Sequence, residues 1–247
     1  MQIQPKEFFL LFIKKEQIAK NTYSFFFDRS GHPFDFLPGQ YNRVFLELSQ
    51  KDERGNHRSF TICSAPQQKG ILMITTKIVD QASPFKQKFN LLIPGEKVRF
   101  FGPMGMFTLP EKSKRPLVFL AGGIGITPFH SMLVSAAASN IKLPITLFVS
   151  FSSPSDVIFH DELMRVSQNN SHIKVVYTIT HQESAETSWN GETGRINAEL
   201  LKKYIPDVSA VEYYVCGPSV MVSSMLDMLH DMKIPFQQIR EEQFTGY

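Results

Sequence analysis

A glycine-rich stretch between a short apolar run and a helix is the part of the sequence best suited to bind an anion. Residues 117–121 are apolar and predict a buried parallel strand. Glycine lets the backbone take positive φ and approach a ligand closely, proline suits the first helical turn, and a helix N-terminus attracts phosphate. The stretch continues with Gly122, Gly123, Gly125, Thr127 and Pro128. We therefore expect a strand, a phosphate-binding turn and a helix that extends to about residue 139.

A second stretch whose residue types could bind a ligand begins at Arg58. Arg58 and Phe60 are two residues apart, which places their side chains on the same face of a strand. The guanidinium of an arginine can form bidentate contacts with phosphate, and an aromatic ring on the same face can flank a flat ligand. Ser59 stands between them, and Thr61 and Ser64 add hydroxyl groups. Taken alone, the pattern also fits a surface arginine beside a core phenylalanine.

Composition and charge restrict the class of protein. The net charge of +3, from 26 basic and 23 acidic residues, is too small to indicate nucleic-acid binding. The apolar runs are too short for a transmembrane segment, and we find no signal-peptide pattern. Two cysteines, Cys63 and Cys216, cannot form a four-cysteine iron–sulfur site within this chain. These features fit a cytoplasmic protein.

The elements that would position these residues fall into two groups. Strand-like runs separated by Pro/Gly turns, with one helix near 83–89, indicate a small antiparallel β-barrel. These runs are 8–13, 23–27, 41–48, 58–62, 70–78 and 96–101. The polar segment 110–116 has proline at both ends and is a candidate linker.

After this segment, strands alternate with helices, which predicts a parallel sheet covered on both faces, with ligands at the carboxyl ends of its strands. The expected strands are 117–121, 145–151, 173–179, 212–216 and 236–241, and the expected helices are 127–139, 159–168, 197–204 and 219–232. We therefore predict two domains, residues 1–112 and 113–247.

Four motifs in register extend this interpretation. They are Arg58-x-Phe60-Thr61-x-x-Ser64, Gly102-Pro103-x-Gly105-x-Phe107, Gly122-Gly123-x-Gly125-x-Thr127-Pro128 and Cys216-Gly217-Pro218-x-x-Met221. Their order and spacing resemble those of the ferredoxin–NADP reductase superfamily, over nearly the whole chain. The resemblance implies a β-barrel that binds a flavin, FAD rather than FMN, followed by an α/β domain that binds a nicotinamide nucleotide.

The resemblance also implies roles for residues of the flavin site. Arg58 corresponds to the arginine on the flavin phosphate, Phe60 to the aromatic packed on the flavin, and Thr61 to the hydroxyl near flavin N5. Ser83 precedes the short helix that would receive the flavin pyrophosphate, although an ordinary serine N-cap is an equal alternative. Thr76 is a further candidate contact, with a plain strand threonine as the alternative.

For the nicotinamide nucleotide, the resemblance places the pyrophosphate on Gly123, Gly125 and Thr127. Cys216 corresponds to a cysteine near nicotinamide C4, although a buried cysteine often serves only as a small apolar residue. Glu242 corresponds to an acid near the active centre. In some members a terminal aromatic covers the flavin, and here Phe244 and Tyr247 are both candidates.

The choice between NADH and NADPH depends on cations near the ribose 2′-phosphate. Thr180 and His181 follow the third strand of the second domain, where an arginine would favour NADPH. Neither side chain carries a permanent charge, and Ser152 and Ser153 after the second strand are also uncharged. The sequence therefore favours NADH slightly.

The implied function is transfer of a hydride from NAD(P)H to FAD N5, with Thr61, Cys216 and Glu242 at the reacting centre. The acceptor of the electrons would be a separate molecule, most simply a small redox protein: a ferredoxin, flavodoxin, cytochrome or oxygenase component. Two alternatives stay open. The chain could be a free-flavin reductase, or an FAD-carrying electron-transfer subunit that depends on a partner.

Overall fold

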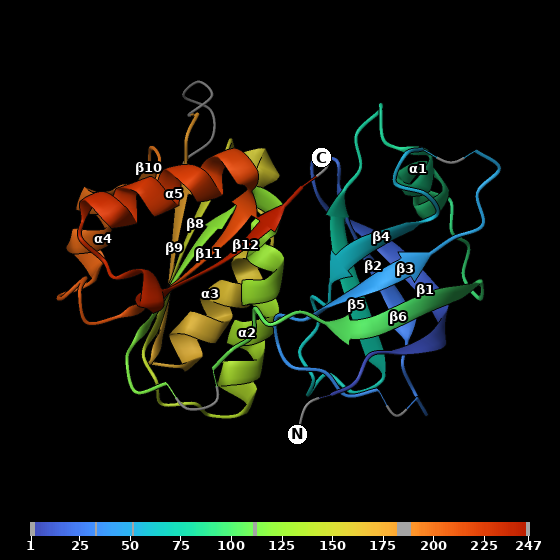
Figure 1. The fold of residues 1–247 in the computed structure, drawn as a ribbon, viewed down its shortest axis with the longest axis horizontal. Coiled ribbons are helices and arrows are strands. Elements are labelled where there is room, and N and C mark those ends of the chain that lie inside the picture. The colour runs from blue at the N-terminus through green and yellow to red at the C-terminus, as the bar shows by residue number, and fades with distance from the viewer. Residues whose placement is uncertain (1–2, 33, 51, 111–112, 182–188, 246–247) are drawn as a thin grey trace.

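The computed structural model describes residues 3–32, 34–50, 52–110, 113–181 and 189–245. Figure 1 shows two units side by side, one built on an antiparallel sheet and one on a parallel sheet with helices. Among the helices that the structure describes, none is long and apolar enough to cross a membrane.

The first unit is a six-stranded antiparallel sheet in the order β4-β3-β6-β1-β2-β5. Its outer strands meet just beyond β4, where the Cys63 N–H donates to the Met73 carbonyl oxygen at 2.8 Å. This contact closes the sheet into the expected barrel. The strands are β1 (Lys6–Ala19), β2 (Thr22–Asp28), β3 (Tyr41–Phe45), β4 (His57–Thr61), β5 (Ile71–Lys77) and β6 (Lys97–Met104), and the helix is α1 (Pro84–Asn90).

Phenylalanine rings fill the barrel because period-2 patterning turns alternate side chains inward. Phe25, Phe27 and Phe100 are fully buried. Helix α1 covers one end of the barrel and adds Phe85 and Phe89 to the same core. The barrel is therefore a rigid support for the residues at the end of β4.

The second unit is a parallel sheet in the order β10-β9-β8-β7-β11-β12. Its strands are β7 (Leu117–Gly122), β8 (Ile145–Phe151), β9 (Ile173–Ile179), β10 (Glu192–Thr193), β11 (Glu212–Pro218) and β12 (Ile239–Phe244). The helices are α2 (Thr127–Ala138), α3 (His160–Asn169), α4 (Ala198–Tyr204) and α5 (Ser219–Asp231), with short 3-10 turns η1 (Gly123–Ile126), η2 (Pro154–Asp156) and η3 (Phe236–Gln238).

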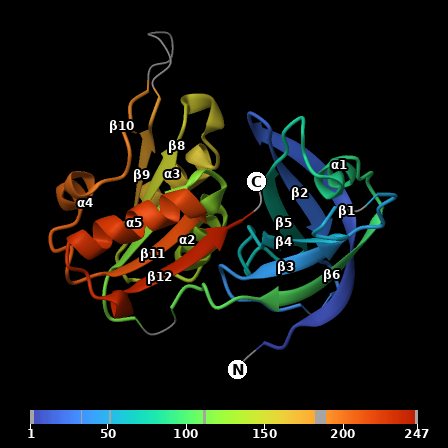
Figure 2. The ribbon, with the colours of Figure 1, turned by 45° about the horizontal axis from the view of Figure 1, so that its top comes forward.

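The helices cover both faces of this sheet, as expected. Side chains of α2 and α3 pack in one hydrophobic core and those of α4 and α5 in the other. Figure 2 shows α2 at the junction, on the side that faces the barrel, and the end of β12 directed toward the barrel. The carboxyl ends of β7, β11 and β12 therefore lie close to the barrel.

The structure corrects some predicted boundaries. Strand β1 extends from Lys6 to Ala19, well beyond 8–13, because it pairs with β6 in its first half and with β2 in its second. The predicted strand 236–241 begins instead as the η3 turn and pairs only from Ile239. Strand β10 was not expected, since two residues are too few for a periodic pattern.

Candidate functional site

Two cavities lie at the junction of the two units. The first, the barrel-side cavity, has a volume of about 450 Å³ and is lined by residues of the barrel, the η1 turn and the end of β12. The second, the sheet-side cavity, has a volume of about 410 Å³ and lies over the carboxyl ends of the parallel strands. Ile124 lines both cavities. Two ligands bound in them would therefore meet beside the glycine-rich turn.

The structure brings most of the expected site residues to these cavities. The barrel-side cavity is lined by Arg58, Ser59, Phe60, Thr61, Thr76, Thr127, Glu242 and Phe244. The sheet-side cavity is lined by Gly122, Gly123, Thr180, Pro218 and Met221. Ser64, Ser83, Gly125, Pro128, His181, Cys216 and Gly217 line neither cavity. Tyr247 lies outside the described residues.

Several residues outside the linings have structural contacts that explain their types. The hydroxyl of Ser64 accepts a hydrogen bond from the Met73 N–H at 3.1 Å, which helps to close the barrel. Ser83 is the N-cap of α1 and accepts from the Lys86 N–H. Pro128 is buried in the first turn of α2, where a proline is favoured. His181 is exposed and lies beside Thr180.

Arg58 and Phe60 are buried on one face of β4, while Ser59 between them is exposed, as the alternation of side chains along a strand requires. Arg58 forms an ion pair with Asp52, and its Nη1 donates to the His57 carbonyl oxygen at 2.7 Å. Its buried Nε has no hydrogen-bond partner among the described residues. A buried donor without a partner is costly, and a phosphate oxygen in the cavity would satisfy it.

Further cations line the same end of the barrel-side cavity. Arg54 and Lys86 join Arg58 there. Burial, together with the charges of Arg54 and Arg58, lowers the pKa of Lys86 to about 8. A cluster of like charges is stabilised by an anion, so this end of the cavity fits the pyrophosphate of a dinucleotide such as FAD. Sequence reasoning missed Arg54 and Lys86, although Lys86 follows the predicted N-cap Ser83 by one helical turn.

The glycine-rich turn has the close packing that a phosphate-binding loop needs. A Cβ on Gly125 would lie 2.4 Å from the Cys216 carbonyl oxygen, and one on Gly122 would lie 2.0 Å from the Met221 sulfur. Gly123 has a φ of +50° and no atom near its Cβ position. The turn is therefore closed toward β11 and open toward the sheet-side cavity, and α2 begins directly after it without a side-chain cap.

Cys216 and Glu242 are neighbours on adjacent parallel strands. Glu242 lines the barrel-side cavity, and its Oε2 is buried without a hydrogen-bond partner among the described residues. Burial raises the pKa of Glu242 to about 7. Burial, with the nearby Glu242 charge, also raises the pKa of the Cys216 thiol. The raised pKa values favour the neutral forms of both groups beside the barrel-side cavity, which Glu242 lines.

The sheet-side cavity contains charged residues that sequence reasoning missed. Lys77 of the barrel forms an ion pair with Asp156 at 3.2 Å, and both line the cavity. Arg195 also lines it and forms no ion pair with the residues that the structure describes. Arg195 follows the two-residue strand β10, whereas Thr180 and His181 directly follow β9, where a cation was expected.

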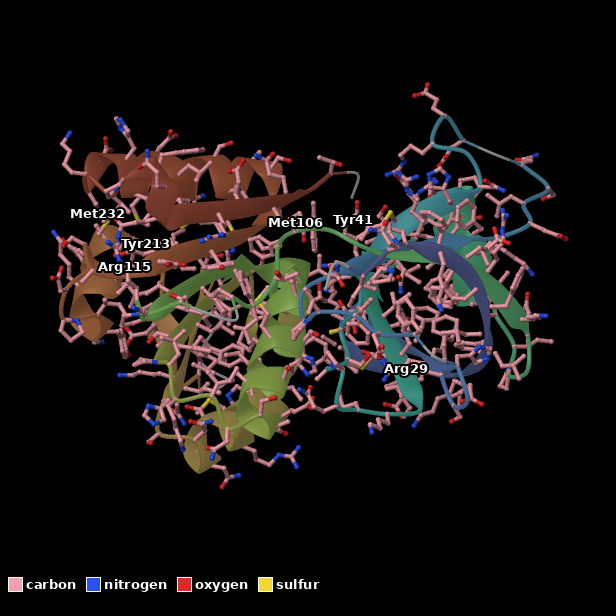
Figure 3. The ribbon with its side chains drawn as sticks, turned by 60° about the horizontal axis from the view of Figure 1, so that its bottom comes forward. Arg29, Tyr41, Met106, Arg115, Tyr213 and Met232 are labelled. Carbon is pink, nitrogen blue, oxygen red and sulfur yellow. The ribbon has the colours of Figure 1, made fainter. Side chains whose placement is uncertain are left out.

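The junction also includes residues around Tyr41, which lines the barrel-side cavity. Figure 3 shows Tyr41 beside Met106, where the chain leaves the barrel for the parallel sheet. Met106 is 84% exposed, while a Cβ on Gly105 would meet the Tyr41 ring at 3.0 Å. Gly105 therefore lets this segment pass close to the ring.

Comparison with known proteins places both units in described families. Residues 10–109 match the oxidoreductase FAD-binding domain and residues 119–227 the oxidoreductase NAD-binding domain. A glycine betaine monooxygenase reductase subunit of Pseudomonas aeruginosa is 28% identical over 211 residues, 85% of this chain and 57% of the relative. An NADH-cytochrome b5 reductase 1 of Mortierella alpina is 27% identical over 93% of this chain and 76% of the relative. The chain thus spans little more than half the length of the first of these relatives.

Solved structures share the fold. The Amycolatopsis cytochrome P450 reductase GcoB has a TM-score of 0.83 at 19% identity, over 98% of this chain and 71% of that chain. A ferredoxin NADP+ reductase from Neisseria gonorrhoeae, with bound FAD and NADP, has a TM-score of 0.79 at 23% identity, over 96% of this chain and 98% of that chain. With its FAD-binding barrel followed by an NAD-binding parallel sheet, the chain belongs to the ferredoxin–NADP reductase superfamily.

Proposed function

We propose that the chain is an FAD-dependent NAD(P)H oxidoreductase that passes electrons to a separate acceptor. The observation that supports this most strongly is the meeting of the two cavities at the η1 turn, beside Ile124. When bound, FAD would accept a hydride from a nicotinamide and release the electrons singly. The protein then has to hold both ligands, orient them and exclude water between them.

In this proposal the barrel-side cavity holds FAD. Arg58 and Lys86 would bind its pyrophosphate, since both are cationic groups at one end of the cavity. The ring of Phe60 would pack on the flavin. Thr61 is buried at the end of β4, and its hydroxyl would orient the reacting edge of the flavin. Phe244 of β12 lines the cavity from the opposite unit and is the proposed aromatic cover.

The sheet-side cavity would hold the nicotinamide nucleotide. Gly123 would position its pyrophosphate at the start of α2, and Gly125 would keep the turn against β11. Thr127, at the same helix start, would contact the pyrophosphate from the barrel-side cavity, which it lines. Cys216 and Glu242 would shape the pocket for the nicotinamide ring. Because Glu242 has a raised pKa, it is the group here that changes charge near neutral pH.

The nucleotide preference stays a prediction. The uncharged residues Thr180 and Ser152 favoured NADH, and both line the sheet-side cavity. Arg195 adds a permanent cation to that lining, which is the kind of group that binds a ribose 2′-phosphate. We therefore infer that Arg195 decides how well NADPH competes with NADH.

The acceptor is proposed from the relatives. Their printed names include a monooxygenase reductase subunit, an NADH-quinone reductase subunit and a cytochrome b5 reductase. A small redox protein, namely a ferredoxin, flavodoxin, cytochrome or oxygenase component, is the acceptor class that fits. The division into 1–112 and 113–247 and a cytoplasmic location also stay proposals. Both cysteines are free, which suits a reducing compartment.

The test is anaerobic reduction of the FAD-loaded protein. NADH and NADPH are added in separate cuvettes, and loss of the flavin absorbance is recorded for the wild type and for Arg195→Gln. Rapid bleaching by at least one nucleotide is expected, with a selective loss of NADPH efficiency in Arg195→Gln. Flavin that stays bound but is bleached by neither nucleotide would contradict the proposal. Protein that releases flavin on gel filtration yet reduces added flavin would indicate a free-flavin reductase instead.

A further inference from the structure

Where α2 contacts the barrel, a buried histidine forms an ion pair with a half-exposed glutamate, and the proposed chemistry does not use this pair. His130, at the end of the first turn of α2, is fully buried. Its Nδ1 lies 2.8 Å from the Cys63 carbonyl oxygen, and its Nε2 lies 2.9 Å from Oε2 of Glu162 on α3. The next residue, Ser131, donates from its hydroxyl to the Ser64 carbonyl oxygen at 2.7 Å. Consecutive residues of α2 thus bind consecutive carbonyl groups of the barrel.

These contacts connect the two cavities by short stretches of chain. Helix α2 begins at Thr127, directly after the glycine-rich turn, so His130 lies about one turn from it. Cys63 follows Thr61, the last residue of β4, by two positions. A shift at the His130 contact would therefore move the proposed nucleotide loop relative to the proposed flavin-orienting hydroxyl. Figure 1 shows α2 as the helix that faces the barrel.

The geometry also defines the charge of His130. Both ring nitrogens face oxygen atoms that can only accept, so only an imidazolium donates to both. Burial opposes this charge, but the contacts with Cys63 and Glu162 outweigh it and raise the pKa of His130 to about 10. The Cys63 sulfur lies 3.7 Å from Nδ1, and the Phe159 ring packs on the imidazole with centroids 4.2 Å apart. The His130 hydrogen bond lowers the pKa of Glu162, and the charges of His130 and Arg165 lower it as well.

We propose that His130 and Glu162 are positioning residues that set the register of the nicotinamide nucleotide against the flavin. This role rests on the proposed function. His130 lines neither cavity, and the pair acts through the Cys63 carbonyl group, beside the contact of Ser131 with the Ser64 carbonyl group. Hydride transfer depends steeply on the distance between donor and acceptor, and a misplacement of about 1 Å can cost on the order of 100-fold in rate.

A pair that only stabilised the fold would give a different result. Removing it would then lower the unfolding temperature and the amount of bound flavin, without changing the reduction rate of each flavin that stays bound. A positioning pair affects that rate directly. The two roles are therefore separated by the reduction rate per bound flavin and by the charge-transfer absorbance of the nicotinamide stacked on reduced flavin.

The experiment uses the FAD-loaded full chain in anaerobic stopped flow with the nucleotide that reduces the wild type faster. The variants are His130→Phe, which keeps an aromatic ring, and Glu162→Gln, which keeps the shape of a half-exposed side chain. We expect the limiting rate to fall at least tenfold in both, with a weaker charge-transfer band and nucleotide Kd within about threefold of wild type. Glu162→Gln serves as the decisive variant if His130→Phe does not fold.

Two controls separate the pair from its surroundings. Asp161→Asn removes a 91% exposed carboxylate one position from Glu162 on the same helix, and it should leave the rate unchanged. Cys63→Ala removes the thiol but keeps the carbonyl group that His130 binds, so it should retain most of the rate.

A wild-type rate per bound flavin in Glu162→Gln would overturn the inference, as would an equal loss in Asp161→Asn. A large loss in Cys63→Ala would also overturn it, because the thiol would then be the functional group. A wild-type protein that holds FAD but is reduced by neither nucleotide would refute the proposed function itself, and the role of the pair with it.

Discussion

Replacing Glu242 with glutamine should stabilise the protein above neutral pH while it impairs the proposed chemistry. The Glu242 carboxyl lies at the barrel-side cavity, and its Oε2 is buried without a hydrogen-bond partner in the described part of the chain. Burial raises its pKa from 4.5 to about 7. An ionised carboxylate at this position therefore costs folding free energy, and an amide of the same shape does not carry that cost.

The size of the effect follows from the difference between the two pKa values, 7 − 4.5 = 2.5. Each unit corresponds to about 1.36 kcal/mol, so the full penalty is about 3 kcal/mol. Because the folded state holds the proton more tightly, stability falls as pH rises from 4.5 to 7 and is constant above this window. The gain from Glu242→Gln should therefore be about 1 kcal/mol at pH 5 and about 3 kcal/mol at pH 8.

The assay is urea unfolding of FAD-free wild type and Glu242→Gln at both pH values, followed by fluorescence. Glu241→Gln is the matched control, since Glu241 is the exposed neighbour on the same strand, and its effect should stay within about 0.5 kcal/mol. A Glu242→Gln variant that is no more stable than wild type at pH 8 would refute the reasoning. Equal gains in the two variants would do so as well.

Three further outcomes follow from the site. Arg58→Ala should weaken FAD binding about 10- to 100-fold in a fluorescence titration. The control Arg99→Ala, on the exposed face of β6, should not weaken it. Unchanged affinity in Arg58→Ala would exclude the phosphate role. Gly125→Ala should lower the free energy of unfolding by about 3 kcal/mol, because the added Cβ would meet backbone atoms. Gly123→Ala should lower it by only about 1 kcal/mol. Calorimetry showing the reverse order would contradict the packing argument. FAD affinity should fall as pH rises above about 8, where Lys86 loses its proton. Lys86→Gln should flatten this pH dependence. An identical pH dependence in the variant would rule out Lys86 as a group that binds FAD.

The fold could be predicted from the sequence where a local pattern of apolar and turn residues recurs. Buried parallel strands such as β8 and β9 are short apolar runs between turn residues, and their predicted bounds match the structure. The turn at Gly123 and Gly125 was predictable because few residues other than glycine fit a positive φ or a Cβ-to-backbone approach of 2.4 Å. A motif can be predicted from the sequence when a local backbone geometry requires each of its residue types.

The parts that escaped prediction depend on contacts between distant segments. His130 and Cys63 are 67 positions apart, and His130 and Glu162 are 32 apart. No periodicity indicates that these three meet at one contact between the units. Arg195 was missed because it follows β10, and a strand of two residues is too short to carry a hydrophobic pattern.

The central claim is that a hydride passes directly between ligands held in the two cavities. The most direct measurement is anaerobic stopped-flow reduction of the FAD-loaded protein with nicotinamide nucleotide deuterated at C4 on one face or the other. Direct transfer predicts bleaching of the flavin with a primary isotope effect, and loss of deuterium, for only one of the two labelled faces. Bound flavin that neither nucleotide reduces, or deuterium lost equally from both faces, would contradict it.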